Sequence, residues 1–551
     1  MNNNDIFETL DMVVGQATDE YIDSLTDDDL TNNTLDVLLA DLFNFTNRNI
    51  NSINSQRTKE DPKIQSLRSP LPYQIACLIM KTHNVIRLNY GTDDSSPSDM
   101  CPLAVYNESG KYKGVYTTDE SDIENIIRYA CKTITTAGVK ETVAFLRGMA
   151  PVKTRCSDRN LIPVNNGVYD YENKLLFDFE PEFVFSSKIG TDYNPAATNV
   201  VIHNDEDGTD WDVESWIREL SDEPGAEKLF WQIIGASVRS NNNWNQAAFF
   251  YATKGNNGKG TFCRMIRNLI GLSNCCSIPL DTMGKDFMLS PLLKASAIVV
   301  DENNVGAYIE KTADLKALIT DDCVCINIKH KNPVQYAFHG FMIQCLNDTP
   351  RFRDKTDSML RRIIFVPFDK CFTGRERKYI KEDYLGRSDV LEYVLKHVLE
   401  DMPDYYSIEI PDFCKNALDD FRIANDNVAE FADAVLPYLV WDMIPWKMLY
   451  SFYKGWLDKY GAGGNNRSRV KFRDFTMSMR NLLDTGKFDW EYMADNSQIY
   501  NTNLDHMTEP EPLILELEVT ELISKTYRGN DRMRFCTLDD VPERIRGIRR
   551  V

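Results

Sequence analysis

Four short apolar runs between residues 247 and 368 constrain the fold of this chain more than any other feature. The runs are AAFFYAT, SAIVVDEN, GFMIQCLND and RRIIFVPF. Segments with helical periodicity, such as GTFCRMIRNLIG, lie between them. The first three runs lead into a glycine-rich turn, a pair of acids and an asparagine. Buried strands that alternate with helices form a parallel sheet, and polar residues at their carboxyl ends mark its functional edge. The sequence therefore predicts an α/β fold for this region.

The first run leads into GNNGKGTF, a glycine-rich turn at the start of the next helix. Such a turn directs backbone N–H groups and the positive end of the helix toward one point, where di- and triphosphates bind. The pattern GxxxxGK[ST] is met with two departures. Thr253 replaces the first glycine, and Gly260 replaces the hydroxyl residue that binds magnesium. The predicted ATP-binding residues are Gly255, Asn256, Asn257, Gly258, Lys259, Gly260 and Thr261.

The second run ends in two acids, Asp301 and Glu302. At the end of a buried strand, an aspartate can hold Mg²⁺ through water, and a neighbouring glutamate can polarise the water that attacks the γ-phosphate. A surface turn with two acids is a common alternative. The lysine of the glycine-rich turn upstream favours the ATPase interpretation. Asp301 and Thr261 are the predicted metal ligands.

The third and fourth runs add two further candidate sites. Asn347 ends the third strand, where its amide can touch the γ-phosphate and the attacking water. Arg361 and Arg362 begin the fourth strand, where an arginine can stabilise charge on the phosphoryl group of a neighbouring subunit. A surface arginine pair is the competing interpretation.

A predicted β-hairpin separates the second and third runs. Alternation in VCINI and VQYAF surrounds the polar tip KHKNP. The tip carries Lys329, His330 and Lys331, and a basic tip in an acidic protein is a candidate for gripping phosphates in a channel. A solvated turn is the alternative.

Together these segments resemble the superfamily 3 helicases of viruses, phages and plasmids. The segment from residue 161 to 197 is similar to the domain that precedes the motor in poxvirus-type and phage or plasmid primase-helicases, and the resemblance covers about residues 155–370. It implies an AAA+-like P-loop motor that forms hexameric rings, hydrolyses ATP and moves 3′ to 5′ along single-stranded DNA. It also implies that Arg362, with Arg361 as second choice, is the arginine finger, and that Lys316 reaches the neighbour's nucleotide.

Charge and cysteine usage limit the function classes. The net charge of −21 argues against a protein that coats DNA with its whole surface, yet leaves room for DNA inside a channel. The thirteen cysteines form no CxxC pair, so we expect reduced thiols in the core rather than a zinc site. Reduced thiols are typical of a cytoplasm, which would be that of a bacterial host if the protein belongs to a phage or other mobile element. We expect neither a membrane span nor a signal peptide.

The flanks are predicted from shorter patterns. We expect a helix over residues 73–88, helical text over 376–430, and strands in PLILELEVTELI. Two helices joined by the basic loop GAGGNNRSRVK suggest a winged-helix-like domain that reads origin duplex DNA, or a helical face that packs on the motor. Its candidate DNA contacts are Arg467, Arg469, Lys471 and Arg473. The arginines near the C-terminus form either a DNA-contacting tail or disordered charge.

The predicted domains are five. They are an acidic helical region over 1–95, a mixed α/β domain over 96–205, the ATPase over 206–375, a helical extension over 376–434 and the winged-helix-like domain over 435–551. The leading functional hypothesis is a hexameric replicative helicase acting on single-stranded and forked DNA. The alternatives are an ATP-regulated initiator or scaffold that does not translocate, and a primase-helicase with unrecognised primase motifs.

Overall fold

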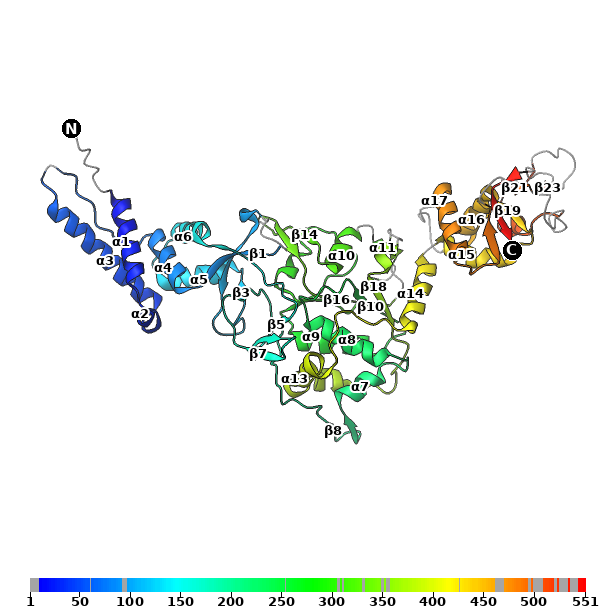
Figure 1. Ribbon diagram of the computed structural model, residues 1–551, viewed down its shortest axis with the longest axis horizontal. Helices are drawn as coiled ribbons and strands as arrows, with labels where there is room; N and C mark the ends of the chain where they lie inside the picture. The colour runs from blue at the N-terminus through cyan, green and yellow to red at the C-terminus, as the bar shows by residue number, and fades with distance from the viewer. Residues whose placement is uncertain are drawn as a thin grey trace. The chain divides into compact units, whose positions relative to one another are not determined.

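A computed structural model describes most of the chain, in two compact units (Figure 1). One unit holds residues 1–348 and 356–415, and the other holds 349–355 and 416–551. The finer division into five domains stays a prediction. The described residues are 9–59, 61–91, 97–252, 254–304, 308–309, 312–329, 332–347, 351–352, 357–425, 427–460, 470–493, 497–498, 509–519, 523–524, 534–535 and 544–551.

The chain begins with helices that pack around a small sheet. Threonines stand at the N-caps of the first three, and the Thr9 and Thr26 side chains accept bonds from backbone N–H groups of the first turn. The sheet has the order β3-β2-β1-β4. These elements are α1 (Leu10–Ser24), α2 (Asp27–Asn32), α3 (Leu35–Gln56), α4 (Pro72–Thr82), α5 (Glu120–Ala130), α6 (Thr136–Met149), β1 (Val85–Asn89), β2 (Leu103–Tyr106), β3 (Tyr116–Thr117) and β4 (Val152–Thr154).

The helix predicted over residues 73–88 is right up to residue 82 and wrong beyond it. Helix α4 ends at Thr82, His83 is extended, and the last four residues of the segment belong to strand β1. Strand β1 lies between β2 and β4, and four of its five residues are buried. A short apolar run buried on both faces has no periodicity that distinguishes a strand from a helix.

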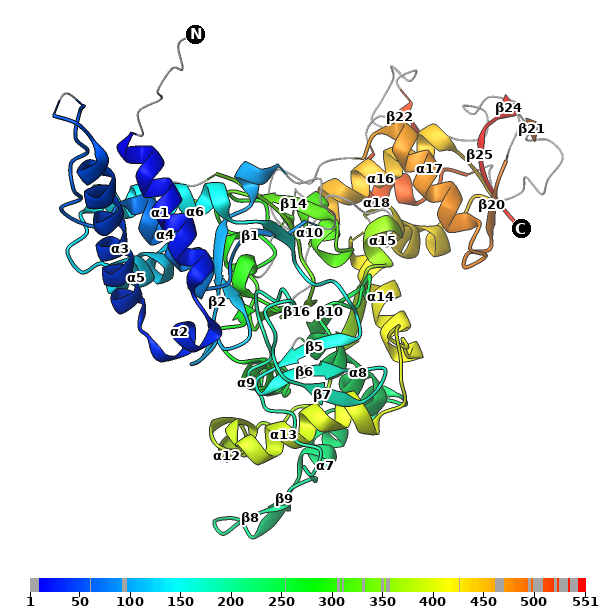
Figure 2. The same ribbon diagram turned by 60° about the vertical axis from the view of Figure 1, so that its left-hand side comes forward.

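Short strands follow, as the sequence of residues 161–197 indicates. Strands β5, β6 and β7 form an antiparallel meander (Figure 2). Helix α8 is buried along its length, and helix α7 begins at the Asp212 cap. The bounds are β5 (Leu161–Val164), β6 (Gly167–Asp170), β7 (Leu175–Phe177), β8 (Ile202–Asn204), β9 (Thr209–Trp211), α7 (Val213–Glu219) and α8 (Ala226–Val238).

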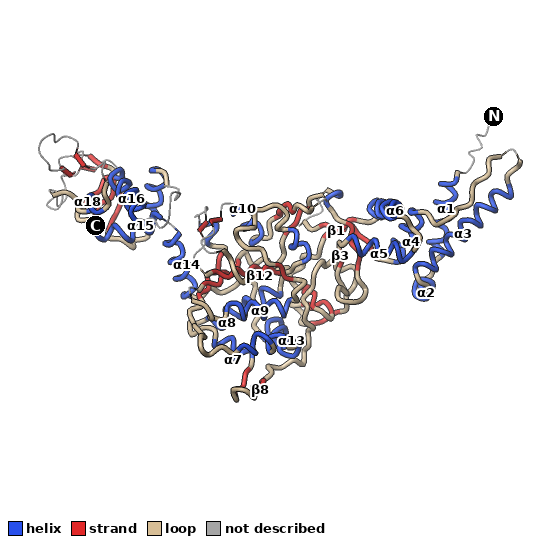
Figure 3. The backbone as a smooth tube through the Cα atoms, turned by 180° about the vertical axis from the view of Figure 1, so that it is seen from behind, coloured by secondary structure: helices blue, strands red, loops and turns tan. Residues whose placement is uncertain are grey.

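A five-stranded sheet forms the centre, and all its pairings are parallel, as predicted. Its order is β11-β12-β16-β10-β18, so the strand that ends at Asn347 lies between the strand before the glycine-rich turn and the strand before Asp301. Helices α8 and α9 pack against one face (Figure 3). The elements are β10 (Ala247–Tyr251), α9 (Lys259–Ile270), β11 (Cys275–Cys276), β12 (Ala297–Val300), β16 (Phe341–Leu346) and β18 (Ile363–Pro367).

The predicted hairpin is present as β14 (Cys323–Ile326) and β15 (Val334–Ala337), paired antiparallel. Arg155 supports its base, because one guanidinium nitrogen donates to the Ala337 carbonyl at 2.5 Å. The ring of Tyr336 lies 5.1 Å from the same guanidinium. Cys323 and Cys325 are exposed, which corrects their assignment to the core: the hairpin buries only alternate residues, Val324 and Ile326.

Residues 376–430 are mainly helical, as predicted. They include α12 (Lys378–Glu382), α13 (Ser388–Lys396), a π-helical turn (His397–Asp401) and α14 (Asp412–Asn425). Two further helices lie earlier in the chain, α10 (Thr312–Ile319) before the hairpin and α11 (Asp357–Leu360) before β18. Among the described helices of the whole chain, each is too short or too polar to cross a bilayer.

The second unit packs helices against a three-stranded sheet of order β19-β25-β20. Both helices predicted around the basic loop are present, and Phe475, Met479 and Leu483 of α17 enter a core with Trp441. The bounds are α15 (Asn427–Val435), β19 (Met443–Pro445), α16 (Trp446–Tyr460), α17 (Phe472–Leu483), β20 (Trp490–Tyr492), α18 (Leu513–Glu516) and β25 (Gly547–Arg550). Two-residue strands add β21 (Ser497–Gln498) with β24 (Arg544–Ile545), and β22 (Ile523–Ser524) with β23 (Arg534–Phe535).

Two expectations for this unit are corrected. The text predicted as strand includes a helical turn, α18, which follows Pro512 and buries Leu513 and Ile514. The last arginines are not disordered charge, because β25 is the central strand of its sheet, and a contact with DNA stays a prediction. Arg549 is paired with Glu491, and Arg550 with Asp442 at 3.3 Å.

Candidate functional site

The turn between β10 and α9 places a backbone cradle at the carboxyl edge of the sheet. Gly258 has φ +89°, and a Cβ there would lie 2.8 Å from Leu220 Cδ2. Only glycine adopts this conformation freely and fits this space. Asn256 also has positive φ, and its carbonyl accepts from the Phe372 N–H at 2.8 Å. The turn is therefore held by local geometry and by a segment distant in the sequence.

Lys259 joins the turn to the neighbouring strand. Its side chain is buried, and its ammonium donates to the Leu346 carbonyl at 2.6 Å and to Asn347 Oδ1 at 2.9 Å. Burial lowers the pKa of Lys259, while the charge of exposed Glu302 acts to raise it. The structure thus brings together the lysine and the asparagine that the sequence singled out. Asn347 itself is exposed at the end of β16.

Asp301 follows β12 and is paired with Arg267 through Oδ2. The second guanidinium nitrogen of Arg267 donates to the Val299 carbonyl at 2.8 Å, so this arginine fixes both the strand and its terminal acid. Asp301 Oδ1 is buried and has no hydrogen-bond partner among the described residues. An unpaired buried carboxylate oxygen is costly, and an ion or its water shell would satisfy it.

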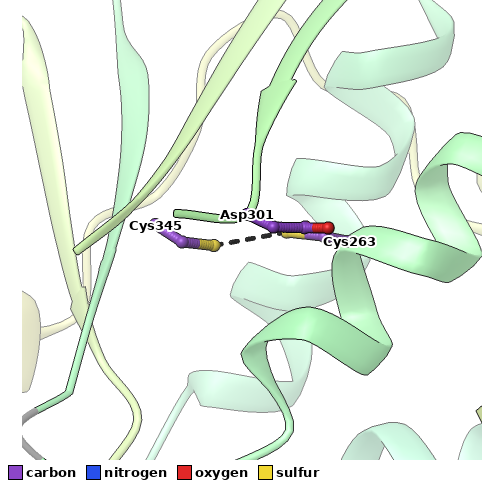
Figure 4. Close-up of side chains that lie close together, drawn as sticks. All are labelled: Cys263, Asp301 and Cys345. Atoms are coloured by element: carbon purple, nitrogen blue, oxygen red, sulfur yellow. Dashed lines mark hydrogen bonds between the residues drawn. The ribbon is translucent and has the colours of Figure 1, made fainter. Parts of the chain in front are cut away.

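Two thiols lie against Asp301 (Figure 4). Cys263 of α9 and Cys345 of β16 are buried, and their Sγ atoms are 3.4 Å apart. One ligand atom from each thiol and one carboxylate oxygen of Asp301 all lie within 4.8 Å of one another. The hydrogen bond to Cys345 and burial raise the pKa of Cys263, so this thiol stays protonated at neutral pH in the absence of an ion.

Sequence reasoning missed Cys263 and Arg267, although a signal for both was available. They follow Lys259 at intervals of four residues on α9, and residues at that spacing share one face of a helix. Asn303 was also missed. It donates to Gln344 Oε1 and to the Cys345 carbonyl, both at 3.0 Å, and ties the end of β12 to β16.

A cleft of about 270 Å³ opens beside the turn. Its apolar wall comes from Trp216, Leu220, Phe372 and Ile380. Its cationic residues are Arg375, Arg377, Lys378 and Lys381, and the turn itself contributes Asn256, Gly258 and Thr261. No pattern within one segment indicates this cleft, because its walls come from α7, α9 and the segment after β18.

The predicted magnesium ligands fit only in part. The free Oδ1 of Asp301 suits an ion held through water, and oxygen is the ligand that Mg²⁺ prefers. Thr261 lines the cleft beside the turn instead, and no contact joins it to Asp301 among the described residues. Gly260 offers no hydroxyl.

The arginine candidates differ in their surroundings. Arg362 is half-buried and donates to the carbonyl and hydroxyl of Ser358, whereas Arg361 is exposed. Lys316 is half-buried in the last turn of α10. None of the three is joined to Lys259 or Asp301 by a described contact.

The DNA-binding candidates are only partly described. Lys329 is exposed next to the hairpin tip, and His330 and Lys331 lie outside the described residues, as do Arg467 and Arg469. Lys471 is the N-cap of α17, and it and Arg473 are exposed. Arg480, on the same helix, packs against Trp446 and Tyr492 instead.

Three family models match the chain. One described as D5 N terminal like matches residues 72–222, and one described as poxvirus D5 protein-like matches residues 423–510. The third, described as a family of unknown function, matches residues 250–362, from the glycine-rich turn to Arg362. Over these two segments the chain resembles the poxvirus D5-like primase-helicases. The two matches flank the central sheet, and the resemblance supports a role in DNA replication.

Solved structures give only distant matches. An apo structure of the NrS-1 C terminal region is 12% identical, with 87% of this chain and 99% of that chain covered and a TM-score of 0.42. A second apo form is 14% identical, covers 76% and 86%, and has a TM-score of 0.40. A JCV helicase bound to a small molecule is 13% identical, with 40% of this chain and 62% of that chain covered and a TM-score of 0.25. At these scores no residue role is transferred from them.

Proposed function

We propose that this D5-like chain is an ATP-dependent hexameric DNA helicase that moves 3′ to 5′ in the replication of a phage, plasmid or other mobile element. The observation that carries the proposal is the bond between the Lys259 ammonium and Asn347 Oδ1 at 2.9 Å, at the sheet edge where Asp301 also stands. Three distant segments converge there, in the arrangement that phosphoryl transfer requires.

Each group in this proposal has a distinct role. Lys259 leaves Leu346 and Asn347 for the β- and γ-phosphates, so nucleotide binding breaks two hydrogen bonds and frees the Asn347 amide for the attacking water. Asp301 would hold Mg²⁺ through Oδ1, and the bound ion would supply charge neutralisation on the phosphates. Exposed Glu302 polarises the attacking water.

The cleft beside the turn suits the remainder of a nucleoside triphosphate. Its apolar wall offers Phe372 and Trp216 to a base, and three of its cations, Arg375, Lys378 and Lys381, are candidates for the phosphates. The fourth, Arg377, is paired with Glu219 of the same cleft. Lys381 stands next to the place where the absent hydroxyl would be, because a Cβ on Gly260 would lie 3.6 Å from Lys381 Nζ. A cation there can compensate phosphate charge in the absence of the hydroxyl.

The test is Glu302→Gln, which keeps shape and removes the charge. We expect nucleotide binding within about twofold of wild type and unwinding of forked DNA reduced at least ~100-fold, because a general base contributes about 10²–10⁴-fold. Glu409→Gln, at an exposed ion pair with Lys228, is the matched control and should unwind normally. Normal unwinding by Glu302→Gln would refute the motor. If the wild-type protein binds DNA in an ATP-dependent way but does not unwind it, the chain is the non-translocating initiator.

A further inference from the structure

We propose that Cys263, Cys345 and Asp301 form a binding site for a thiophilic divalent cation, with Zn²⁺ as the physiological candidate (Figure 4). The site lies behind the nucleotide edge of the sheet, between α9 and β16. It is distinct from the magnesium site in its ligands, because two of its three donors are sulfur. Mg²⁺ prefers oxygen ligands, whereas thiolates select Zn²⁺ and other soft ions.

The spacing of the sulfurs favours an ion over a disulfide. A tetrahedral Zn²⁺ binds sulfur at about 2.3 Å, which places two sulfurs about 3.8 Å apart. The observed separation is 3.4 Å, so only a few tenths of an ångström separate this geometry from the bound one. A disulfide bond of about 2.0 Å would require the sulfurs to approach by more than 1 Å in a close-packed interior.

The third ligand atom is available. Asp301 Oδ1 is buried without a partner, while Oδ2 is occupied by Arg267. Arg267 therefore orients the carboxylate and leaves one oxygen for a metal, in the way that outer partners of metal ligands usually act. Among the described residues, each thiol has the other as its sulfur neighbour.

The ion has a route in through Asp301. The two cysteines are 0% and 1% exposed and Asp301 Oδ1 is buried, but the Asp301 side chain as a whole is 39% exposed, so one carboxyl group separates the thiols from solvent. A water molecule from that side completes a tetrahedral shell. Three protein ligands and one water are a common zinc arrangement.

The experiment uses the full-length protein, stripped of metal and without nucleotide. Cd²⁺ serves as a spectroscopic probe through its thiolate charge-transfer absorption, and Zn²⁺ affinity is measured by competition with a chromophoric chelator. We expect wild type to bind one equivalent of the metal ion. In Cys263→Ala and in Cys345→Ala the affinity for this ion should be at least ~100-fold weaker. Cys414→Ala, at another buried cysteine, should retain it.

Variants that keep shape guard against misfolding. Cys263→Ser and Asp301→Asn preserve volume and should weaken Zn²⁺ binding at least ~10-fold while their thermal midpoints without metal stay near wild type. Equal stoichiometry and affinity in wild type and all the ligand variants would overturn the site.

A consequence for activity rests on the proposed function. An ion held at Asp301 Oδ1 competes with the water shell of Mg²⁺, so Zn²⁺ should inhibit ATP hydrolysis by wild type at concentrations that spare Cys345→Ala. The binding measurement needs no ATP. If the chain proves not to hydrolyse ATP, the metal site is still tested, and if binding fails, the helicase proposal is untouched.

Discussion

Gly258 and Gly260 stand two residues apart in one turn, yet a side chain would meet different surroundings at each. At Gly258 a Cβ would collide with Leu220 in a left-handed backbone conformation. At Gly260, among the described residues outside the helix's own turn, a Cβ would come within 4 Å of Lys381 Nζ alone, the far end of a flexible side chain. The first glycine is required by the fold, while the second leaves room for the hydroxyl that the turn lacks.

We expect Gly260→Ser to fold and to lower the Mg²⁺ concentration for half-maximal ATPase activity several-fold, because its hydroxyl can bind the ion directly. Gly260→Ala is the control for helix propensity. It should raise the free energy of unfolding by about 0.5–1 kcal/mol without changing the Mg²⁺ requirement. An unchanged requirement in Gly260→Ser would show that the hydroxyl cannot reach the metal.

Gly258→Ala should behave in the opposite way. Strain at positive φ and the 2.8 Å approach to Leu220 predict a loss of about 1–3 kcal/mol of stability and of nucleotide binding. Urea unfolding and binding of a fluorescent ATP analogue measure the two effects. Wild-type behaviour of Gly258→Ala would mean that the turn relaxes without its glycine.

At the scale of elements, the hairpin depends on the turn that leads into it from α10. Asp321 in this turn has φ +56°. Burial raises the pKa of Asp321 to about 7, Asp322 adds to the rise, and Arg155 opposes it. A carboxyl with a raised pKa binds more protons in the folded than in the unfolded chain, so stability falls as pH rises from about 4 to 7 and is level above.

Asp321→Asn should remove that fall, since an amide does not titrate and asparagine tolerates positive φ. The full shift corresponds to ~4 kcal/mol, and partial exposure of the turn reduces the expected gain at pH 8 to about 2 kcal/mol. Urea unfolding of both proteins at pH 5 and pH 8 measures it. Equal pH dependence would exclude Asp321 as the titrating group.

The hairpin tip carries the second prediction at this scale. We expect Lys329→Ala combined with His330→Ala to weaken single-stranded DNA binding while subunit assembly stays intact. The slope of log affinity against log salt concentration should fall by about the amount that one phosphate contact contributes. Lys228→Ala, which removes an exposed cation elsewhere, is the control. Unchanged affinity at physiological salt would make the tip a solvated turn.

For the whole molecule, the central question is whether the arginines before β18 act across a subunit interface. Arg362 donates to Ser358 of its own chain, which holds it half-buried, and exposed Arg361 is the freer of the two. A finger must reach a phosphate on another subunit, and so it must be free to extend. The structure of one chain therefore makes Arg361 as strong a candidate as Arg362.

Mixing experiments separate the two arginines. Arg361→Ala or Arg362→Ala alone should lower ATPase activity by about 10³-fold or more if that residue is the finger. Mixed with Lys259→Ala subunits, the finger variant should recover part of the activity, because each intact site combines a lysine from one subunit with an arginine from the next. A variant that acts only on its own fold would recover nothing.

The sequence by itself determined four of the five strands of the central sheet, their parallel direction, the hairpin and the residues at the carboxyl edge, and it missed the two-residue strand β11. These features follow from local patterns: apolar runs of strand length, helical periodicity and glycine at a tight turn. A local pattern is read within one segment, so Lys259, Asp301 and Asn347 could be named before any contact between them was known.

Only the tertiary structure decided which groups share a space. The partner of Asp301 is Arg267, the cleft draws its walls from three segments, and the last two arginines lie on a central strand and pair with Glu491 and Asp442. Packing between distant segments sets these contacts, and charge or composition within one segment carries no record of its partner. Strand β1 shows the same limit, because burial on both faces removes the periodicity that a sequence pattern needs.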